Sequence, residues 1–168
     1  LPFINDAKYG FMNTDGQVMV QNDYDFAGFF QEGLAIVVIN EKYGFVNKQG
    51  EQQIKCMFES ASDFNGGRAI VELNGKIGMI DRNGRFIFEC IYDDLGIFSE
   101  QKVYASVDEK YGYYNSKGEQ VIPHQFDDAY DFHDGIAKVI SDEKQSFIDS
   151  TGAYTVPLVY EEVRLYFD

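Results

Sequence analysis

The stretch Lys42-Tyr43-Gly44-Phe45-Val46-Asn47-Lys48-Gln49-Gly50 decides the interpretation of this sequence, because its pattern recurs along the chain. Its first lysine and its last glycine both recur at a constant step of 34 residues, without insertion or deletion. Strict self-similarity of this kind indicates one supersecondary unit repeated about five times. The recurring residues are Lys8, Lys42, Lys76, Lys110 and Lys144, and Gly16, Gly50, Gly84, Gly118 and Gly152.

Each repeat has the pattern of a three-stranded antiparallel meander. Leu34–Ile39 is rich in Ala, Ile and Val and predicts a first strand. A two-residue hairpin turn is expected at Asn40-Glu41 and at Asn74-Gly75, because Asn and Gly tolerate positive φ. A second strand is expected over Lys42–Asn47, ending in an Asx-x-x-Gly turn. A third, shorter strand is expected to include Val18–Val20, Phe86–Phe88 and Val121–Ile122.

The second strands are apolar on both faces. Phe45 and Val46 are consecutive, so they point to opposite sides of their sheet. A strand that is buried on both sides belongs to a stacked array in which neighbouring repeats cover each other. We therefore expect Ile80 and Ile148 to be core residues, and a single repeat should not fold alone.

The segments that connect the repeats have a different periodicity. Phe126, Ala129 and Phe132 are spaced by three residues, which predicts a 3₁₀ or single helical turn with these side chains in the core. The same spacing occurs in the other connecting segments. An acidic residue follows the first aromatic residue of each segment, where it is expected to cap the free amides of the turn. These acidic residues are Asp25, Glu59, Asp93, Asp127 and Glu161.

The repeated stretch resembles the bacterial WG (or KWG) repeat family. Val121-Ile122-Pro123 and Phe132-His133-Asp134-Gly135-Ile136-Ala137 add to the match, which covers essentially the whole chain. The resemblance implies a repeat scaffold, often part of larger bacterial and cell-envelope proteins, and so favours a cell-envelope or extracellular location. The signature Trp is replaced by Tyr9, Tyr43, Ile77, Tyr111 and Gln145, and the Gly after it by Ser146 in the last repeat.

The expected fold is an all-β domain over residues 1–168, with units at about 8–41, 42–75, 76–109, 110–143 and 144–168. Leu1–Ala7 aligns with Ala35–Glu41, so it is the first strand of a preceding or closing unit. An open, curved array is predicted. The alternative is a closed, five-bladed propeller-like ring in which residues 1–7 complete the last unit. An open array must protect its strand edges, which we expect at Leu1–Ala7 and Val163–Phe167.

Composition excludes several classes of protein. The chain has 14 Lys and Arg against 28 Asp and Glu, a net charge of −14, which opposes binding to the phosphate backbone of nucleic acids. No apolar run approaches the roughly 20 residues of a membrane-spanning helix, and no signal peptide is visible. Two cysteines do not make a disulfide scaffold.

Cys56 and Cys90 occupy the same position in adjacent repeats, and a zinc site that they share with His124 can be considered. Equivalent residues of three-stranded repeats lie roughly 14 Å apart, beyond both metal sharing and a disulfide. Two free thiols in half-buried strands are therefore predicted. If each repeat contributed only one strand per layer, equivalent residues would lie closer together and this prediction would change.

The densest acidic segment contains Asp127, Asp128, Asp131 and Asp134. It lacks the alternating Asp or Asn and the closing Glu of a calcium loop, so we interpret it as a solvated connecting segment with His133 exposed.

No nucleophile elbow, Walker loop or dinucleotide fingerprint is present, so no catalytic residue, metal ligand or cofactor is expected, and ligand-binding residues stay unassigned. The leading hypothesis is a non-catalytic scaffold for a protein partner, which the negative charge favours as basic. The second is a carbohydrate or cell-wall binding module, which predicts exposed tyrosines at Tyr9, Tyr43 and Tyr111. The third is an enzyme with an asymmetric carboxylate pair, whose residues would depart from the repeat pattern.

Overall fold

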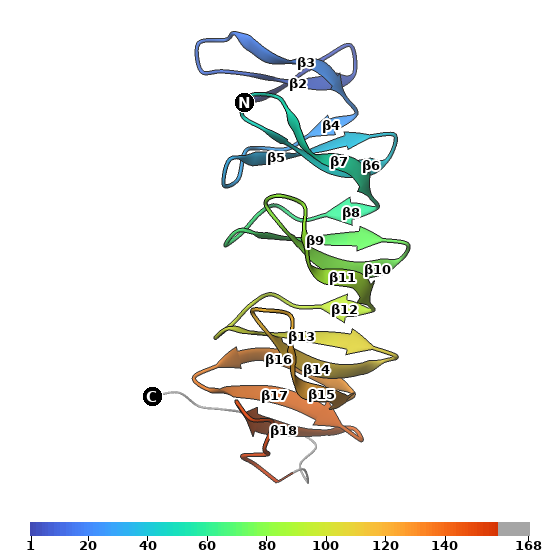
Figure 1. Ribbon diagram of the computed structural model, residues 1–168, viewed down its shortest axis with the longest axis vertical. Helices are drawn as coiled ribbons and strands as arrows, with labels where there is room; N and C mark the ends of the chain where they lie inside the picture. The colour runs from blue at the N-terminus through green and yellow to red at the C-terminus, as the bar shows by residue number, and fades with distance from the viewer. Residues whose placement is uncertain (158–168) are drawn as a thin grey trace. The chain divides into compact units, whose positions relative to one another are not determined.

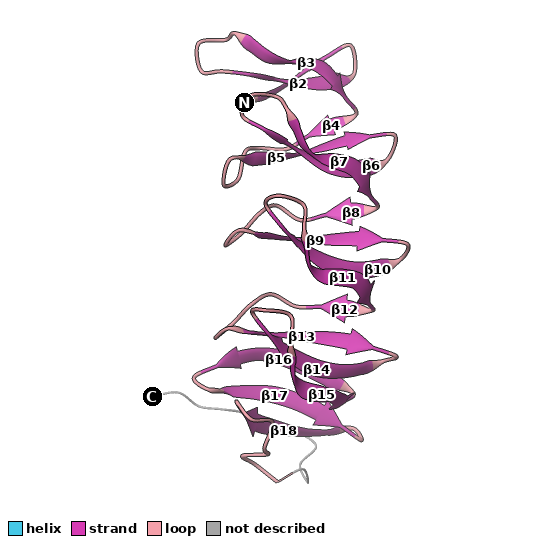
Figure 2. Ribbon diagram, in the orientation of Figure 1, coloured by secondary structure: helices cyan, strands magenta, loops and turns pink. Residues whose placement is uncertain are grey.

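The computed structural model describes residues 1–157, apart from the side chain of Asn22. These residues form strands β1 to β18 and no helix (Figure 2). The described chain accordingly has no helix that is long and apolar enough to cross a membrane. The prediction of an all-β repeat fold is confirmed.

The strands form five antiparallel sheets in chain order (Figure 1). The chain divides into two compact units, Leu1–Cys90 (unit 1) and Ile91–Asp168 (unit 2), and each is described by itself. The first two sheets are β1 (Pro2–Asn5), β2 (Lys8–Met12) and β3 (Val18–Tyr24), then β4 (Phe26–Ala27), β5 (Leu34–Ile39), β6 (Lys42–Asn47) and β7 (Gln52–Phe58). The third contains β8 (Ser60–Ala61), β9 (Arg68–Leu73), β10 (Lys76–Asp81) and β11 (Phe86–Tyr92). The last two are β12 (Asp94–Leu95), β13 (Lys102–Val107), β14 (Lys110–Asn115) and β15 (Gln120–Phe126), then β16 (Asp128–His133), β17 (Ile136–Ser141) and β18 (Lys144–Asp149).

The predicted meander is present in every complete repeat. β5 and β6 have the predicted bounds, and the third strand is longer than expected, since β7 continues to Phe58. The turn between β5 and β6 has positive φ at both Asn40 (50°) and Glu41 (62°), as a two-residue hairpin requires. At the end of β6, Asn47 Oδ1 accepts hydrogen bonds from the amides of Gln49 and Glu51, and the Gly50 amide donates to the Asn47 carbonyl.

The connecting segments are short strands, so the prediction of a 3₁₀ or helical turn is wrong. β4, β8, β12 and β16 each pair with the first strand of the next repeat. β4, β8 and β12 thereby add a fourth strand to a meander, whereas the last sheet contains β16, β17 and β18 among the described residues. The amides of Asp25 and Gly28 donate to the carbonyls of Val38 and Ile36, so the neighbouring strand replaces local helical hydrogen bonds. A register shift between Ala129 and Phe132 lets both side chains enter the core from an extended backbone.

Gly44 marks the place where β7 crosses closely over β6. The pairing of these strands shifts register between Tyr43 and Phe45. A Cβ atom on Gly44 would lie 2.6 Å from both the Cys56 amide nitrogen and the Ile54 carbonyl oxygen. In the last repeat Ser146 occupies this position and is fully buried, and its Oγ donates to the Val156 carbonyl at 2.5 Å. Among the described residues that follow it, Ile148 and Tyr154 form an isolated bridge.

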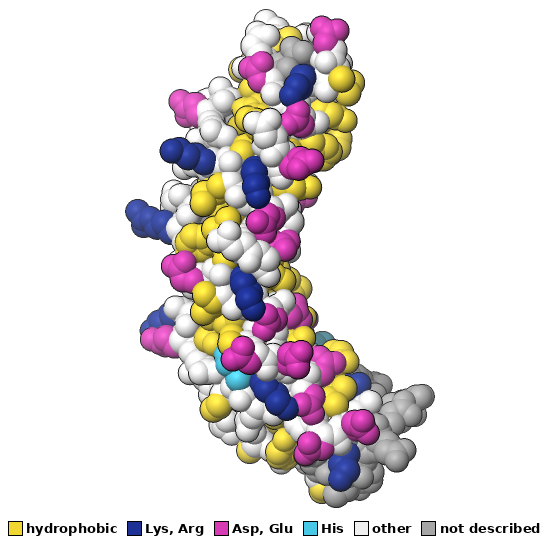
Figure 3. All heavy atoms as spheres, turned by 90° about the vertical axis from the view of Figure 1, so that its right-hand side faces the viewer, with side chains coloured by type: hydrophobic (Ala, Val, Ile, Leu, Met, Phe, Trp, Pro, Cys, Tyr) yellow, Lys and Arg dark blue, Asp and Glu magenta, His cyan; other side chains and the backbone are white. Residues whose placement is uncertain are grey.

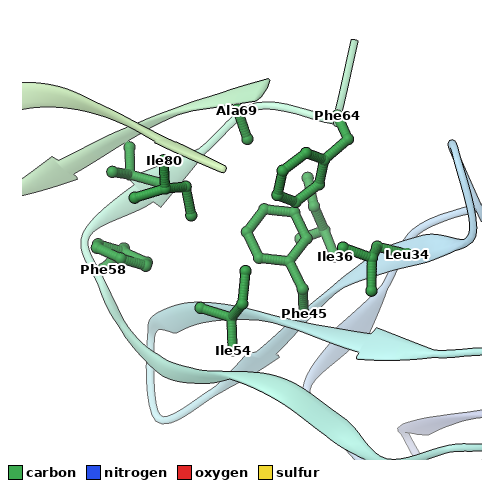
Figure 4. Packing of buried hydrophobic residues seen from close by; sticks show 9 residues of the cluster. Leu34, Ile36, Phe45, Ile54, Phe58, Phe64, Ala69 and Ile80 are labelled. Atoms are coloured by element: carbon green, nitrogen blue, oxygen red, sulfur yellow. The ribbon is translucent and has the colours of Figure 1, made fainter. Parts of the chain in front are cut away.

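Hydrophobic side chains from neighbouring sheets form shared cores. In unit 1, Phe45 of the second sheet packs against Phe64, which precedes β9 of the third, with ring centroids 4.8 Å apart (Figure 4). Val46, on the opposite face of β6, joins a second core with Phe11 and Tyr24 of the first sheet. Burial on both faces is confirmed, as is the predicted burial of Ile80 and Ile148, which are both 0% exposed.

β1 pairs with β2 in the first sheet, and the sheet of the last repeat contains β16, β17 and β18 among residues 1–157. The ring alternative requires residues 1–7 to join that last sheet. No sheet of the described chain closes into a barrel, as expected for an open array. The predicted edge at Val163–Phe167 lies outside the described residues.

Candidate functional site, a tyrosine and aspartate cluster

The acidic residues that follow the first aromatic residue of each connecting segment have a structural role. Asp25 accepts hydrogen bonds from the Lys8 ammonium and from the Asn40 amide (2.7 Å), and Asp127 binds Lys110 and the Asp142 amide (2.7 Å) in the same way. They therefore cap the next two-residue hairpin turn, and the predicted capping of a helical turn is wrong. The lysine hydrogen bonds are the main reason why the pKa values of Asp25 and Asp127 are lowered.

Glu59 follows the same arrangement, because it accepts from the Gly75 amide at 2.9 Å and lies 3.6 Å from Lys42 Nζ. The corresponding Glu161 lies outside the described residues. An arrangement that recurs with the repeat stabilises the fold and does not distinguish one surface of the chain from another.

Six side chains of unit 2 gather on one surface, where several of them depart from the repeat pattern. Asp94 and Asp128 occupy the position that holds Phe26 and Ser60 in unit 1. Where Tyr104 lies, the equivalent residues of unit 1 are Ile36 and Ile70, and where Tyr130 lies they are Gly28 and Ser62. We call this set the tyrosine–aspartate cluster, and its members are Asp94, Tyr104, Tyr111, Asp128, Tyr130 and Asp131.

The sheets of unit 2 position these side chains. Tyr111 on β14 donates its hydroxyl to Asp94 Oδ2 on β12 at 3.1 Å. The ring centroids of Tyr104 and Tyr111 are 6.0 Å apart. Gly96 makes room for the Tyr104 ring, since a Cβ atom there would lie 2.5 Å from it. Asp128 at the start of β16 accepts the Ala129 amide at 2.9 Å with one carboxylate oxygen.

The surroundings of the cluster are electronegative. Burial raises the pKa of Tyr104, and the neighbouring carboxylates of Asp94, Asp131 and Asp128 raise it further. Burial, followed by the charge of Asp94, also raises the pKa of Tyr111. Burial raises the pKa of Asp131, so its ionised form is held at a cost in free energy. A positive charge placed here would relieve that cost.

A cation already lies at the margin of this surface. Lys138 Nζ sits 4.9 Å from the centroid of the Tyr130 ring. The chemistry available is thus the binding of cations and hydrogen-bond donors by carboxylate oxygens and aromatic faces. The phenols have raised pKa values and stay neutral near pH 7. No three His, Cys, Asp or Glu residues between Leu1 and Pro157 are grouped so that they could hold a metal ion.

The acidic segment singled out from the sequence is divided between several roles. Asp128 and Asp131 join the cluster, and Asp127 caps a hairpin turn. Asp134 lies in a turn with φ of 51°, where its carboxylate is 3.5 Å from His133 Nε2. The side chain of His133 is 75% exposed, as predicted. The segment is a strand, whereas the sequence indicated only a solvated connection.

Cys56 and Cys90 are free, half-buried thiols, as predicted. Each lies against its own sheet, with Cys56 Sγ 3.7 Å from the Val37 carbonyl and Cys90 Sγ 3.9 Å from the Val71 carbonyl. Burial raises both thiol pKa values. His124 lies on β15, where its Nε2 is 3.3 Å from the Tyr114 hydroxyl and burial lowers its pKa.

Tyr9, Tyr43 and Tyr111 are half-buried, so they form neither the exposed row of a sugar-binding surface nor a fully buried core. The Tyr9 ring packs on Phe26 at 5.6 Å. Sequence reasoning missed Asp94, Tyr104 and Tyr130 as site residues. Their departure from the repeat pattern was a signal that could have identified them.

Two grooves lie at equivalent positions of the two units. One is lined in unit 1 by residues that include Asn47, Lys48 and Arg82, and the other in unit 2 by residues that include Asn115 and Lys117. Both grooves are bounded by Asx turns, and their positions recur with the repeat.

Comparison with solved structures finds similar arrangements at low sequence identity. The extracellular domain of a one-component system from B. thetaiotaomicron has a TM-score of 0.45 and 12% identity over 92% of this chain, which spans 28% of that domain. A protein of unknown function from Bacteroides caccae has a TM-score of 0.33 and 13% sequence identity, and the match covers 92% of this chain and 75% of that protein. A plant lectin with two metal binding sites from Cicer arietinum has a TM-score of 0.30 and 13% sequence identity, and the match covers 73% of this chain and 84% of the lectin.

No curated protein matches the sequence. The WG containing repeat matches four times in succession, at residues 9–43, 43–76, 77–111 and 111–144. These matches follow the 34-residue period and cover most of the chain, and each runs from the second strand of one meander to the second strand of the next. The chain therefore belongs to the family of WG containing repeat proteins.

Proposed function

We propose that this chain is a non-catalytic repeat module of a larger bacterial protein, and that it binds a protein partner through basic side chains. The observation that carries the proposal is the tyrosine–aspartate cluster, where three carboxylates and three phenol rings gather and several of these residues depart from the repeat pattern. Guanidinium and ammonium groups are the partners that such a surface favours, because they combine charge pairing with stacking on aromatic faces.

The charge of the whole chain supports a basic partner. A net charge of −14 attracts a positively charged surface over a distance of about one Debye length, which raises the rate of encounter. Acidic and basic side chains are interspersed on the face that Figure 3 presents, with apolar side chains between them. Long-range attraction would bring the partner close, and the cluster would supply a specific contact.

Binding of a carbohydrate is a weaker candidate. Sugar stacking requires an open aromatic face, and Tyr9, Tyr43 and Tyr111 are half-buried. Tyr130 is 42% exposed, but Lys138 lies over its ring. A glycan could use this ring only by displacing the lysine side chain.

The proposal can be tested with a fluorescent nona-arginine peptide as probe, by anisotropy at increasing ionic strength. We expect binding that weakens as salt rises, because exposed charges are screened. Asp131→Asn and Asp128→Asn should each weaken binding about two- to fivefold, the range for exposed charge pairs. Asp63→Asn is the matched control, because Asp63 is the equivalent of Asp131 two repeats earlier and lies outside the cluster.

Equal losses for Asp131→Asn and Asp63→Asn would show that only the diffuse charge of the chain is involved, and that the cluster is not the site. Binding of a soluble oligosaccharide that is insensitive to salt and is lost in Tyr130→Ser would instead favour the carbohydrate function. Tyr130→Ser restores the residue found at the equivalent position, Ser62.

A further inference from the structure

The groove of unit 1 differs in charge from its counterpart in unit 2. Its volume is about 500 Å³, within the range of about 300–1,000 Å³ that is usual for ligand sites. Most of its lining side chains are polar, Lys48 and Arg82 are cationic, and no Asp or Glu of the described chain lines it. The groove of unit 2 is lined by Glu100 as well as by lysines. The unit 1 groove, which we call the basic groove, is thus a cationic surface in a chain whose net charge is −14.

Two Asx turns of neighbouring repeats supply the cations of the basic groove. Lys48 lies in the turn after β6, and Arg82 lies at the same repeat position in the turn after β10. A basic residue occurs at this position only in these two repeats, and hydroxyl side chains occupy it in the others. The other residues are Thr14, Ser116 and Ser150. The paired cations therefore depart from the repeat pattern, as the members of the tyrosine–aspartate cluster do.

Hydrogen bonds hold the backbone of both turns. Asn47 Nδ2 donates to Glu51 Oε2 at 2.8 Å, and Asn47 Oδ1 accepts the amide of Gln49 at 3.0 Å. In the second turn, Asp81 Oδ1 accepts the amide of Asn83 at 2.8 Å. Each cationic side chain therefore begins at a backbone position that is fixed by its own turn.

The Arg82 guanidinium reaches the preceding repeat. Its Nη2 donates to the carbonyl oxygen of Glu32, in the tight turn before β5. Gly33 makes room for this contact, since a Cβ atom there would lie 3.2 Å from Arg82 Nη2. In unit 2 the equivalents of Gly33 and Arg82 are Gln101 and Ser150. Because a carbonyl oxygen carries no net charge, this hydrogen bond positions the guanidinium without neutralising it.

The polar groups of the basic groove are available to a ligand. Within residues 1–157, neither Lys48 nor Arg82 forms an ion pair, whereas Lys8, Lys42 and Lys110 pair with the acids of connecting segments. The side chains of Gln49 and Gln53, which also line the groove, make no hydrogen bond to the same part of the chain. Gln53 itself departs from the repeat pattern. Its equivalents are Met19, Ile87, Val121 and Thr155.

We propose that the basic groove binds an acidic peptide segment. A carboxylate of the peptide binds Lys48 and the remaining N–H groups of Arg82, whose planar fork matches a carboxylate. The carboxamides of Gln49 and Gln53 each offer a donor and an acceptor, which suits the peptide backbone. No aromatic side chain of the described chain lines the groove, so it lacks the stacking face that favours a sugar. The site uses no residue of the tyrosine–aspartate cluster and is independent of the proposed basic partner.

The test uses the full chain and a fluorescent tetraglutamate peptide, followed by anisotropy. The net charge of −14 repels this peptide at long range, so its binding requires a local cationic site. Lys48→Ser and Arg82→Ser introduce the residue found at the equivalent positions of unit 2, and each should weaken binding about two- to fivefold. Lys55→Ser is the matched control and should leave binding unchanged, because Lys55 is an exposed cation of β7 that does not line the groove.

A second measurement locates the bound peptide. In NMR spectra, tetraglutamate should shift the side-chain amide signals of Gln49 and Gln53, and uncharged tetraglutamine should not. Absence of tetraglutamate binding would overturn the proposal, as would equal losses for Arg82→Ser and Lys55→Ser. If a trimer of galacturonic acid bound in place of the peptide and Arg82→Ser weakened that binding, the ligand would be an acidic saccharide, and the assignment to a peptide would be wrong.

Discussion

At the scale of single residues, the fold depends on positions where the backbone leaves no room for a side chain. Gly44 lies where β7 crosses β6, and its missing Cβ atom would collide with backbone atoms that cannot move independently. Ser146 stands at the equivalent position of the last repeat, where its hydroxyl donates to the Val156 carbonyl. The glycine of the WG pattern is thus a consequence of strand crossing.

Gly44→Ala should therefore lower the free energy of unfolding by about 1–3 kcal/mol, the range for overpacking. The measurement is urea denaturation followed by circular dichroism. Gly28→Ala is the control, since a Cβ atom there meets its nearest neighbours at an ordinary 3.8 Å, and its effect should stay within about 0.5 kcal/mol. An equal effect of the two substitutions would contradict this explanation.

At the scale of elements, the connecting strand joins one repeat to the next through its acidic residue. Asp127 binds Lys110 of the preceding meander and the turn amide at Asp142 of the following hairpin. The pKa of Asp127 is lowered from 3.8, so the ionised form is the one that stabilises the fold. This contribution is fully present above the ordinary pKa and is lost as the pH falls through the lowered value.

Asp127→Asn should therefore be less stable than the unchanged chain at pH 7, and the difference should shrink as the pH falls through the lowered pKa of Asp127, where its carboxyl group becomes neutral. Urea midpoints measured from pH 7 down into the acidic range provide the test. Asp131→Asn should behave in the opposite way, because burial raises the pKa of Asp131. Its ionised form costs stability above the ordinary pKa, so Asn should stabilise the chain at pH 7. A loss of stability for Asp127→Asn that does not change with pH would contradict the assigned role.

At the scale of the whole molecule, each hydrophobic core belongs to two sheets. Phe64 fills the core between the second and third sheets of unit 1, where it meets Phe45 (Figure 4). Neither sheet buries this surface by itself, so neighbouring repeats should lose their structure together.

Phe64→Ala should cost about 3–5 kcal/mol and should increase hydrogen exchange in both β6 and β9, since the cavity borders both sheets. Phe29→Ala, at a residue that is 65% exposed, should change neither stability nor exchange beyond about 0.5 kcal/mol. Faster exchange confined to β9 would show that the sheets are independent.

Much of the fold could be predicted from the sequence, and the reasons are local. The 34-residue period, the bounds of β5 and β6 and the positive-φ turns follow from residue types at fixed spacing. The connecting segments could not be predicted correctly, because the spacing of Phe126, Ala129 and Phe132 fits both a helical turn and a bulged strand. The pairing partner on β17 decides between them, and it lies in the next repeat.

The sequence by itself thus determined the repeat, its family and the turns, because each depends on the chemistry of a few adjacent residues. Only the tertiary structure decided which side chains gather on one surface. Asp94, Tyr104 and Asp131 come from three different strands, and their proximity arises from sheet pairing and packing between repeats.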